Sequence, residues 1–187
     1  MAYYHCSPTA GLTVLEPRAP TSFEKPHGVY LTTSEPMALM YGIRNYEYSY
    51  GYTRDGQIYY AEYFPNALQL LYKGKSASLY LCAPGRVHTT EIPNEAVCDA
   101  PVVVMHETRI PDVYEALLEQ EARGALTIHR FEALSSGMLD WIRRAEADEI
   151  RRRDLLHTPG PMAEYYRLHY PGSWALAEAG HSRPAAP

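Results

Sequence analysis

Two tyrosines could hold a flat ring between them, because one lies in a predicted strand and the other in the helix that follows. Tyr30 belongs to the segment "GVYLTT", which is typical of a short strand, and Tyr41 comes eleven positions later. Ser34 suits the N-cap of the intervening helix, and Pro36 is tolerated in its first turn. Each tyrosine offers a ring face and a hydroxyl. The pair therefore predicts one of two arrangements. Either both rings pack in the core with their hydroxyl groups in contact with solvent, or the two rings bind a flat ligand ring between them.

Further tyrosines gather in residues 45–64. The chain has 17 tyrosines but only 3 phenylalanines. Every second residue from Tyr46 to Tyr52 is a tyrosine, and this period of two predicts one face of a strand. Asp55 and Gly56 form a turn signal. The segment predicts a hairpin whose tyrosine face either walls a cleft or is covered by later helices.

The thiols offer one candidate nucleophile, Cys6, which follows His5 in the chain. A Cys6–histidine pair is one interpretation, and a small buried residue is the other. Cys82 and Cys98 complete an odd number of cysteines without CxxC spacing. The first residues also lack the pattern of a signal peptide. We therefore expect reduced thiols in a cytoplasmic protein.

Metal binding is not indicated by the histidines. None of the 8 histidines pairs with another at i and i+4 on a predicted helix face. The spacing patterns of tetrahedral metal sites are also missing, so we expect no metal.

Charge and hydropathy limit the partners of the chain. The net charge of -5 over 187 residues argues against a nucleic-acid-binding surface as its main purpose. No run of about 18 apolar residues occurs, so no membrane span is expected. Three arginines at 151–153 stand among Asp148, Glu149 and Asp154, which favours a solvated helix face over a phosphate contact.

The order of predicted elements indicates an α+β fold. Strands are expected through about residue 110, and helical patterns follow Pro111. We expect a mixed, mostly antiparallel sheet in residues 1–110, helices in 111–180 that pack on it, and a disordered tail in 181–187. The expected strands are 2–6, 28–33, the 45–64 hairpin, 76–82, 95–98 and 101–107. The expected helices are 34–41, 66–72, 111–124, 137–156 and 159–180, the last broken at Pro171-Gly172.

The first 110 residues resemble the core of the ADP-ribosyltransferase superfamily, in the diphtheria-toxin and poly(ADP-ribose)-polymerase-like branch of His-Tyr-Glu type. The similarity rests on "YYHCSPTAGLTVLEPR" followed by "HGVYLTTSEPMALMY". His5 corresponds to the histidine that ends the first core strand. Tyr30 and Tyr41 correspond to the strand tyrosine and the helix tyrosine eleven residues later. The helical C-terminal third has no counterpart in this resemblance.

The resemblance implies that NAD is bound, with its nicotinamide ring between Tyr30 and Tyr41. His5 would hydrogen-bond a ribose hydroxyl of the adenosine half, and Cys6 and Ser7 would lie along the same site. A carboxylate would stabilise the positive charge that grows on the other ribose as nicotinamide leaves. Glu95 is the first candidate for that carboxylate, Glu107 the second and Glu91 the third.

Two positions depart from the family pattern. Cys6 stands where glycine is usual, and Ala38 stands where a serine commonly bonds the carboxamide. A side chain at position 6 is tolerable only if it points away from the ligand.

The expected activity is cleavage of NAD and transfer of ADP-ribose to a protein, to a nucleic acid or to water, as in a glycosyltransferase. One alternative is a catalytically inactive domain of the same fold that binds NAD, an ADP-ribosylated group or a protein. Another is an enzyme related to RNA 2′-phosphotransferases, which the acidic balance of the chain disfavours.

Overall fold

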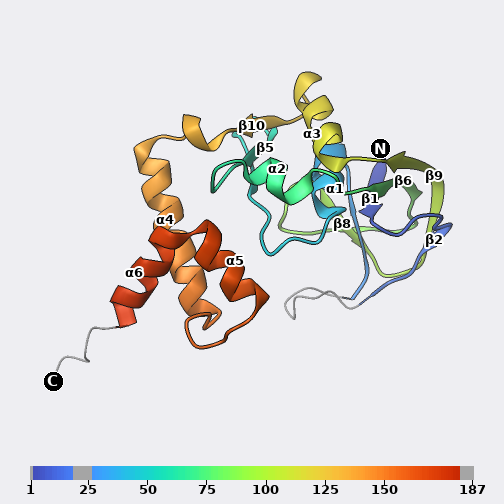
Figure 1. Ribbon diagram of the computed structural model, residues 1–187. Coiled ribbons are helices and arrows are strands. Elements are labelled where there is room, and N and C mark those ends of the chain that lie inside the picture. The colour runs from blue at the N-terminus through green and yellow to red at the C-terminus, as the bar shows by residue number, and fades with distance from the viewer. Residues whose placement is uncertain (1, 19–26, 182–187) are drawn as a thin grey trace. The chain divides into compact units, whose positions relative to one another are not determined.

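The computed structural model describes residues 2–18 and 27–181 and divides into two compact units (Figure 1). The first unit comprises residues 1–60 and 68–128, and the second comprises 61–67 and 129–187. The sequence predicted the boundary between the strand-rich part and the helical part at residue 110. The difference arises because the helix after Pro111 contacts a helix of the sheet unit and so belongs to it. The predicted tail lies outside the described residues, apart from His181.

The first unit is built on a seven-stranded sheet with the order β2-β9-β6-β1-β3-β8-β7. All of its described strand pairs are antiparallel. This confirms an α+β protein with a mostly antiparallel sheet. The strands are β1 (Tyr3–Ser7), β2 (Val14–Leu15), β3 (Val29–Thr32), β6 (Ala77–Ala83), β7 (His88–Thr89), β8 (Glu95–Cys98) and β9 (Val102–Ile110).

Helix α1 (Glu35–Tyr41) contacts β1, β3 and β6 of this sheet. Ser34 caps it by accepting a hydrogen bond from the Met37 amide, and Pro36 lies in its first turn, as predicted. Helix α3 (Val113–Ala122) begins at Asp112, whose carboxylate accepts from two helix amides, and it contacts α1. Helix α2 (Ala67–Tyr72) is the short helix expected before Gly74.

The opposite side of the sheet carries a hydrophobic cluster. Its buried members are Leu15, Val29, Leu31, Tyr80, Cys82, Cys98 and Val102. Val29 and Leu31 alternate with Tyr30 and Thr32 along β3, so the two sets point to opposite faces. Tyr30 and Thr32 therefore stand on the face away from this cluster.

The first strand of the predicted hairpin is shorter than the alternation of tyrosines from Tyr46 to Tyr52 suggested. The hairpin pairs β4 (Tyr50–Tyr52) with β5 (Ile58–Ala61), and β10 (Thr127–His129) completes a three-stranded sheet. Tyr46 and Tyr48 precede β4, so the prediction that they share a strand face with Tyr50 and Tyr52 is wrong. The Tyr48 hydroxyl instead donates to the Ile43 carbonyl, which holds this segment in a turn.

The second unit is helical, with α4 (Ser136–Arg152), α5 (Pro161–His169), α6 (Pro171–His181) and a short 3₁₀ turn at Phe131–Ala133. The break predicted at Pro171 is confirmed. Trp141 was expected on the buried face of α4 but is 52 % exposed, with its ring edge-on to Tyr63. Glu146 and Ala147 take buried positions beside Ile142.

The three arginines at 151–153 serve packing in this unit. Arg151 donates to the carbonyls of Leu176 and Ala177 near the end of α6, while Arg152 and Arg153 pair with Glu149. These contacts agree with a solvated, charge-paired helix face. Within the described ranges, no helix has the length and apolar character needed to cross a bilayer.

Candidate active site

Strand register brings Tyr30 and Glu95 to one face of the sheet. β3 pairs with β8 so that Thr32 lies opposite Glu95 and Tyr30 lies opposite Val97. Directly paired residues of an antiparallel ladder point to the same side, and diagonal neighbours lie about 7–8 Å apart. The Thr32 hydroxyl reaches the Met37 sulfur at 3.2 Å, which identifies this side as the one covered by α1.

Tyr41, at the end of α1, is the centre of a group of aromatic rings. Its ring stacks on Tyr48 with centroids 4.6 Å apart, and Tyr50 meets it edge-on at 5.9 Å. The hydroxyls of Tyr41 and Tyr50 lie 3.1 Å apart. Tyr52 extends the group by an edge-on contact with Tyr50. Tyr41 is still 37 % exposed, so its ring remains accessible to a ligand after these contacts are made.

The segment before β8 is held in place by the same group. Tyr52 donates from its hydroxyl to the Pro93 carbonyl at 2.8 Å. The Thr33 amide donates to the Asn94 carbonyl, and Asn94 adopts a positive φ of 63° at the start of the strand. The segment that leads into Glu95 is therefore held both by the end of β3 and by the hairpin.

Glu95 lies near several of these rings. Its side chain is buried, with 7 % of the residue exposed, and it accepts a hydrogen bond from the Thr90 hydroxyl at 2.9 Å. Burial is the main cause that raises the tyrosine pKa values, and the Glu95 charge raises the pKa further at Tyr30, Tyr41, Tyr50 and Tyr52. Of these four tyrosines, strand register places Tyr30 on the same face as Glu95, as its diagonal neighbour.

His5 is linked to β3 through the main chain of Tyr30. β1 and β3 pair at Tyr4 and Thr32, and the register gives no further pairing between them. Beyond that point the His5 Nδ1 lies 3.0 Å from the Tyr30 carbonyl. A carbonyl can only accept, so Nδ1 carries the hydrogen and Nε2 of the neutral ring is left as an acceptor.

His5 stays neutral near pH 7. Burial lowers its pKa below the usual value, the hydrogen bond to Tyr30 opposes this effect, and the charge of Arg18 lowers the pKa further. By strand alternation the His5 side chain stands with Tyr80 on the face opposite Tyr30. The structure therefore joins His5 to the Tyr30–Glu95 site by way of the Tyr30 main chain.

Cys6 and Ser7 both take structural positions. The Cys6 thiol is buried against Gly42, and burial raises its pKa to about 12. A thiol with this pKa stays protonated at neutral pH, which removes the basis for a Cys6–histidine nucleophile. The Ser7 hydroxyl accepts from the Thr9 amide and shapes the turn after β1. Ala38 is a buried residue of α1. All three cysteines are free, as predicted.

Of the other two candidate carboxylates, Glu107 lies on the His5 face and Glu91 is exposed in a turn. Glu107 accepts from the Ser78 hydroxyl at 2.7 Å and from the Gly11 amide at 3.2 Å, and it pairs with Arg109 at 2.7 Å. These donors fix the loop after β1 to the sheet. Glu107 is therefore part of the scaffold.

Sequence reasoning did not single out Thr90 or Met37 as parts of the site. Thr90 bonds Glu95, and the Met37 sulfur is contacted by Thr32 and Tyr52. Neither residue gave a signal in the sequence, because the Thr90 contact depends on the turn before β8 and the Met37 contacts depend on where α1, β3 and the hairpin meet. Among the described residues, no three His, Cys, Asp or Glu side chains converge as metal ligands would.

Comparison of the chain with protein-family models, with curated proteins and with solved structures gives no significant match.

Proposed function

We propose that this chain has an ADP-ribosyltransferase-like fold and binds NAD, with the nicotinamide ring between Tyr30 and Tyr41 and with Glu95 as the catalytic carboxylate. One observation carries the proposal: a buried carboxylate on β8, Glu95, lies opposite Thr32 and so stands on the same face of the sheet as Tyr30 of β3, on the side covered by α1. The order of His5, Tyr30, Tyr41 and Glu95 in the chain supports it through the family resemblance.

The residues suit the chemistry of NAD cleavage. The bond between the nicotinamide nitrogen and the ribose breaks, its electron pair leaves with nicotinamide, and positive charge develops on the ribose. A fixed negative charge at Glu95 would stabilise that charge in a site of low polarity. The ring of Tyr41, backed by Tyr48, would hold the leaving ring in one orientation by stacking.

The incoming group is a nucleophile on a protein, on a nucleic acid or in water. It forms a bond to the ribose carbon and gives up its proton to Glu95 or to solvent. His5 stands on the other face of the sheet, so its part in this site would be to position the Tyr30 main chain through the hydrogen bond to the Tyr30 carbonyl.

A binding module without catalysis is the second candidate, and two observations favour it. Cys6 and Ala38 are both buried and offer no strong side-chain donor to the carboxamide of nicotinamide. NAD would then be held mainly by ring stacking, with weaker orientation of the bond to be broken.

Calorimetric titration with NAD, run beside a nicotinamide-release assay, separates these functions. An enzyme binds NAD and releases nicotinamide when acceptors or water are supplied. Binding without release supports the module. If the wild-type protein neither binds nor cleaves NAD, the proposal is wrong.

A further inference from the structure

A cavity of about 290 Å³ lies between the sheet of the first unit and the helices α1 and α3. Its floor consists of side chains from paired positions of β1, β6 and β9, namely Tyr4, Leu79, Leu81, His106 and Thr108. Paired residues of an antiparallel sheet point to the same side. Tyr4 is also paired with Thr32, whose hydroxyl contacts α1, so the floor belongs to the side of the sheet that α1 covers.

The walls of this cavity come from two helices that contact each other. α1 supplies Glu35 and Leu39, and α3 with its C-terminal cap supplies Ala116, Glu119, Gln120 and Arg123. Spacings of three and four residues place each set on one face of its helix. The cavity is therefore built on packed helices and strands and not on loops.

The cavity is separate from the site around Glu95. Its floor lies on β1, β6 and β9, whereas Tyr30 and Glu95 lie on β3 and β8, farther along the order of the sheet. A ligand in this cavity does not depend on the proposed binding of NAD.

A buried amide and a carboxylate form the polar end of the cavity. Gln120 is only 3 % exposed, and its Nε2 donates to Glu35 Oε1 at 2.7 Å. Among the described residues, no donor bonds the other carboxylate oxygen of Glu35 or the side-chain oxygen of Gln120. Arg123 lies 3.7 Å from Glu35 Oε1, which is beyond hydrogen-bond reach, so it neutralises the carboxylate only in part.

The lining favours a ligand with a positive charge and an apolar body. It contains the two carboxylates of Glu35 and Glu119 and one guanidinium group. An ammonium group has three donors and no acceptor, which matches the available oxygens at the polar end. Leu39, Leu79 and Leu81 offer an apolar surface beside it. At about 30 Å³ for each water molecule, the volume corresponds to about ten non-hydrogen atoms.

We infer that this cavity binds a small primary amine, with its ammonium group on Glu35 and its apolar body on Leu79 and Leu81. Two kinds of molecule share this chemistry. One is a simple aliphatic amine, and the other is a free amino acid with an apolar side chain, whose carboxylate meets the guanidinium group of Arg123.

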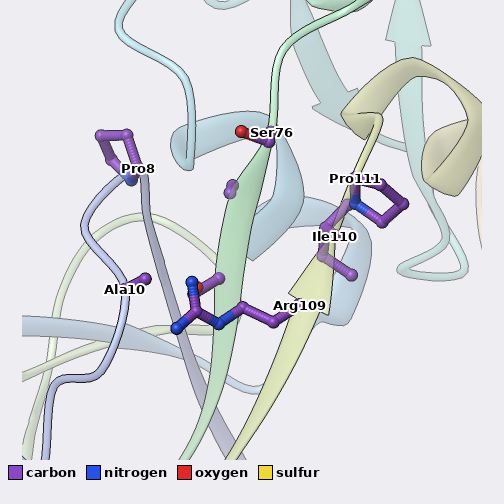
Figure 2. A pocket seen from close by; sticks show the side chains of 8 residues that line it. Pro8, Ala10, Ser76, Arg109, Ile110 and Pro111 are labelled. Atoms are coloured by element: carbon purple, nitrogen blue, oxygen red, sulfur yellow. The ribbon is translucent and has the colours of Figure 1, made fainter.

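The cavity on the other face of the sheet provides an internal comparison. Its volume is about 270 Å³, and Figure 2 shows Arg109 of its lining extending from β9 across β6. Ser78, which is paired with Arg109, lines the same cavity. The charge of Arg109 repels an ammonium group, so an amine should leave this second cavity empty.

Titration of the full chain with isoamylamine, followed by the NMR signals of the Gln120 side-chain amide, tests the inference. We expect a saturable shift of these signals, while the Arg109 Nε–H signal stays unchanged. Glu35→Gln keeps the size of the side chain and removes its charge. The affinity should then fall by about 10- to 100-fold, as for the loss of one charge-assisted contact.

Glu115→Gln is the matched control, since Glu115 is an exposed carboxylate of α3 outside the cavity lining. It should leave the affinity for isoamylamine unchanged. Thermal unfolding of both variants shows whether a loss of affinity reflects a loss of folding. Equal losses for Glu35→Gln and Glu115→Gln, in variants that remain folded, would overturn the inference.

Leucine and isocaproic acid complete the test, because they share the branched body of isoamylamine. Tighter binding of leucine, with an advantage that Arg123→Gln removes, identifies an amino-acid site. Binding of isoamylamine at least as tight as that of leucine identifies a site for simple amines. Isocaproic acid lacks the ammonium group, so binding as tight as that of isoamylamine contradicts the inference. The absence of a saturable shift at up to about 10 mM isoamylamine also contradicts it, whether or not NAD binds elsewhere.

Discussion

Glu95 and Glu107 are both carboxylates on strands of the same sheet, but their surroundings differ. Glu107 is fixed by a hydroxyl, a main-chain amide and a guanidinium group, and the Ser78 hydrogen bond is the main cause that lowers its pKa. Glu95 is more deeply buried and accepts from Thr90, and its charge is among the causes that raise the pKa of four tyrosines. Both were candidates for the same role on sequence grounds.

This difference in surroundings favours Glu95 over Glu107 as the carboxylate of the proposed active site. The negative charge of Glu107 is already used by donors that hold a loop to the sheet. The charge of Glu95 is among the causes that raise the pKa of Tyr30 and of Tyr41. A positive charge that develops on a ligand beside these rings would be stabilised by the carboxylate of Glu95.

Replacement of Glu95 by glutamine gives the largest expected effect. The change keeps the shape and the hydrogen bond from Thr90 but removes the charge. We expect nicotinamide release to fall by about a hundredfold or more, with NAD affinity within about threefold of wild type, because the charge acts mainly on the transition state. Glu107→Gln is the matched control and should leave the release rate nearly unchanged. If Glu107→Gln abolishes release while Glu95→Gln does not, the roles of the two carboxylates are reversed.

Replacement of Tyr30 by alanine should weaken NAD binding by about 1 to 3 kcal/mol, through lost stacking and lost burial of the nicotinamide ring. Tyr30→Phe keeps the ring and should retain most of the affinity. Calorimetric titration measures both. Equal and large losses for the two variants would show that the hydroxyl, not the ring face, holds the ligand.

Gly42 tests how tightly the Tyr41 end of α1 is packed on β1. A methyl group on Gly42 would come within 2.3 Å of the Cys6 sulfur. We expect Gly42→Ala to lower the free energy of unfolding by about 1 to 3 kcal/mol, the usual range for overpacking. The double variant Cys6→Ala/Gly42→Ala removes the sulfur and should recover part of this loss. Denaturant titration of both variants and of Cys6→Ala completes a double-mutant cycle. If the losses in the free energy of unfolding of the two single variants add up to that of the double variant, a direct contact between the two positions is contradicted.

Glu107→Gln should lower stability in a pH-dependent way, with the smallest effect of the four. The pKa of Glu107 is lowered in the folded protein, so the unfolded chain binds more protons at this residue. Its contribution is therefore present above the unfolded pKa of about 4.3 and is lost as pH falls through the lowered folded value. Midpoints of thermal unfolding for wild type and variant should differ at neutral pH and converge in acid. A difference that stays constant down to that range would mean that Glu107 acts by its shape and not by its charge.

Local sequence signals predicted most elements correctly, because their determinants lie within a few residues of one another. Ser34 and Pro36 fixed the start of α1, and Pro171 fixed the break between α5 and α6. The period-two tyrosines were misleading, since Tyr48 bonds the Ile43 carbonyl and leaves the strand pattern. Trp141 was misplaced because helical spacing identifies a face but not which part of it is covered.

The sequence by itself determined the α+β class, the order of strands and helices and the set of candidate residues, since periodicity, caps and turn residues act locally. Tertiary structure alone decided which of those residues meet. The pairing of β3 with β8 brought Glu95 to the α1 side of the sheet, and the pairing of β6 with β9 brought Glu107 and Arg109 to the His5 side. A shift of one residue in either pairing would reverse these faces, and no local pattern near Glu95 or Glu107 encodes that choice. The physical reason is that register is selected by the burial of whole faces, which involves residues far apart in the chain.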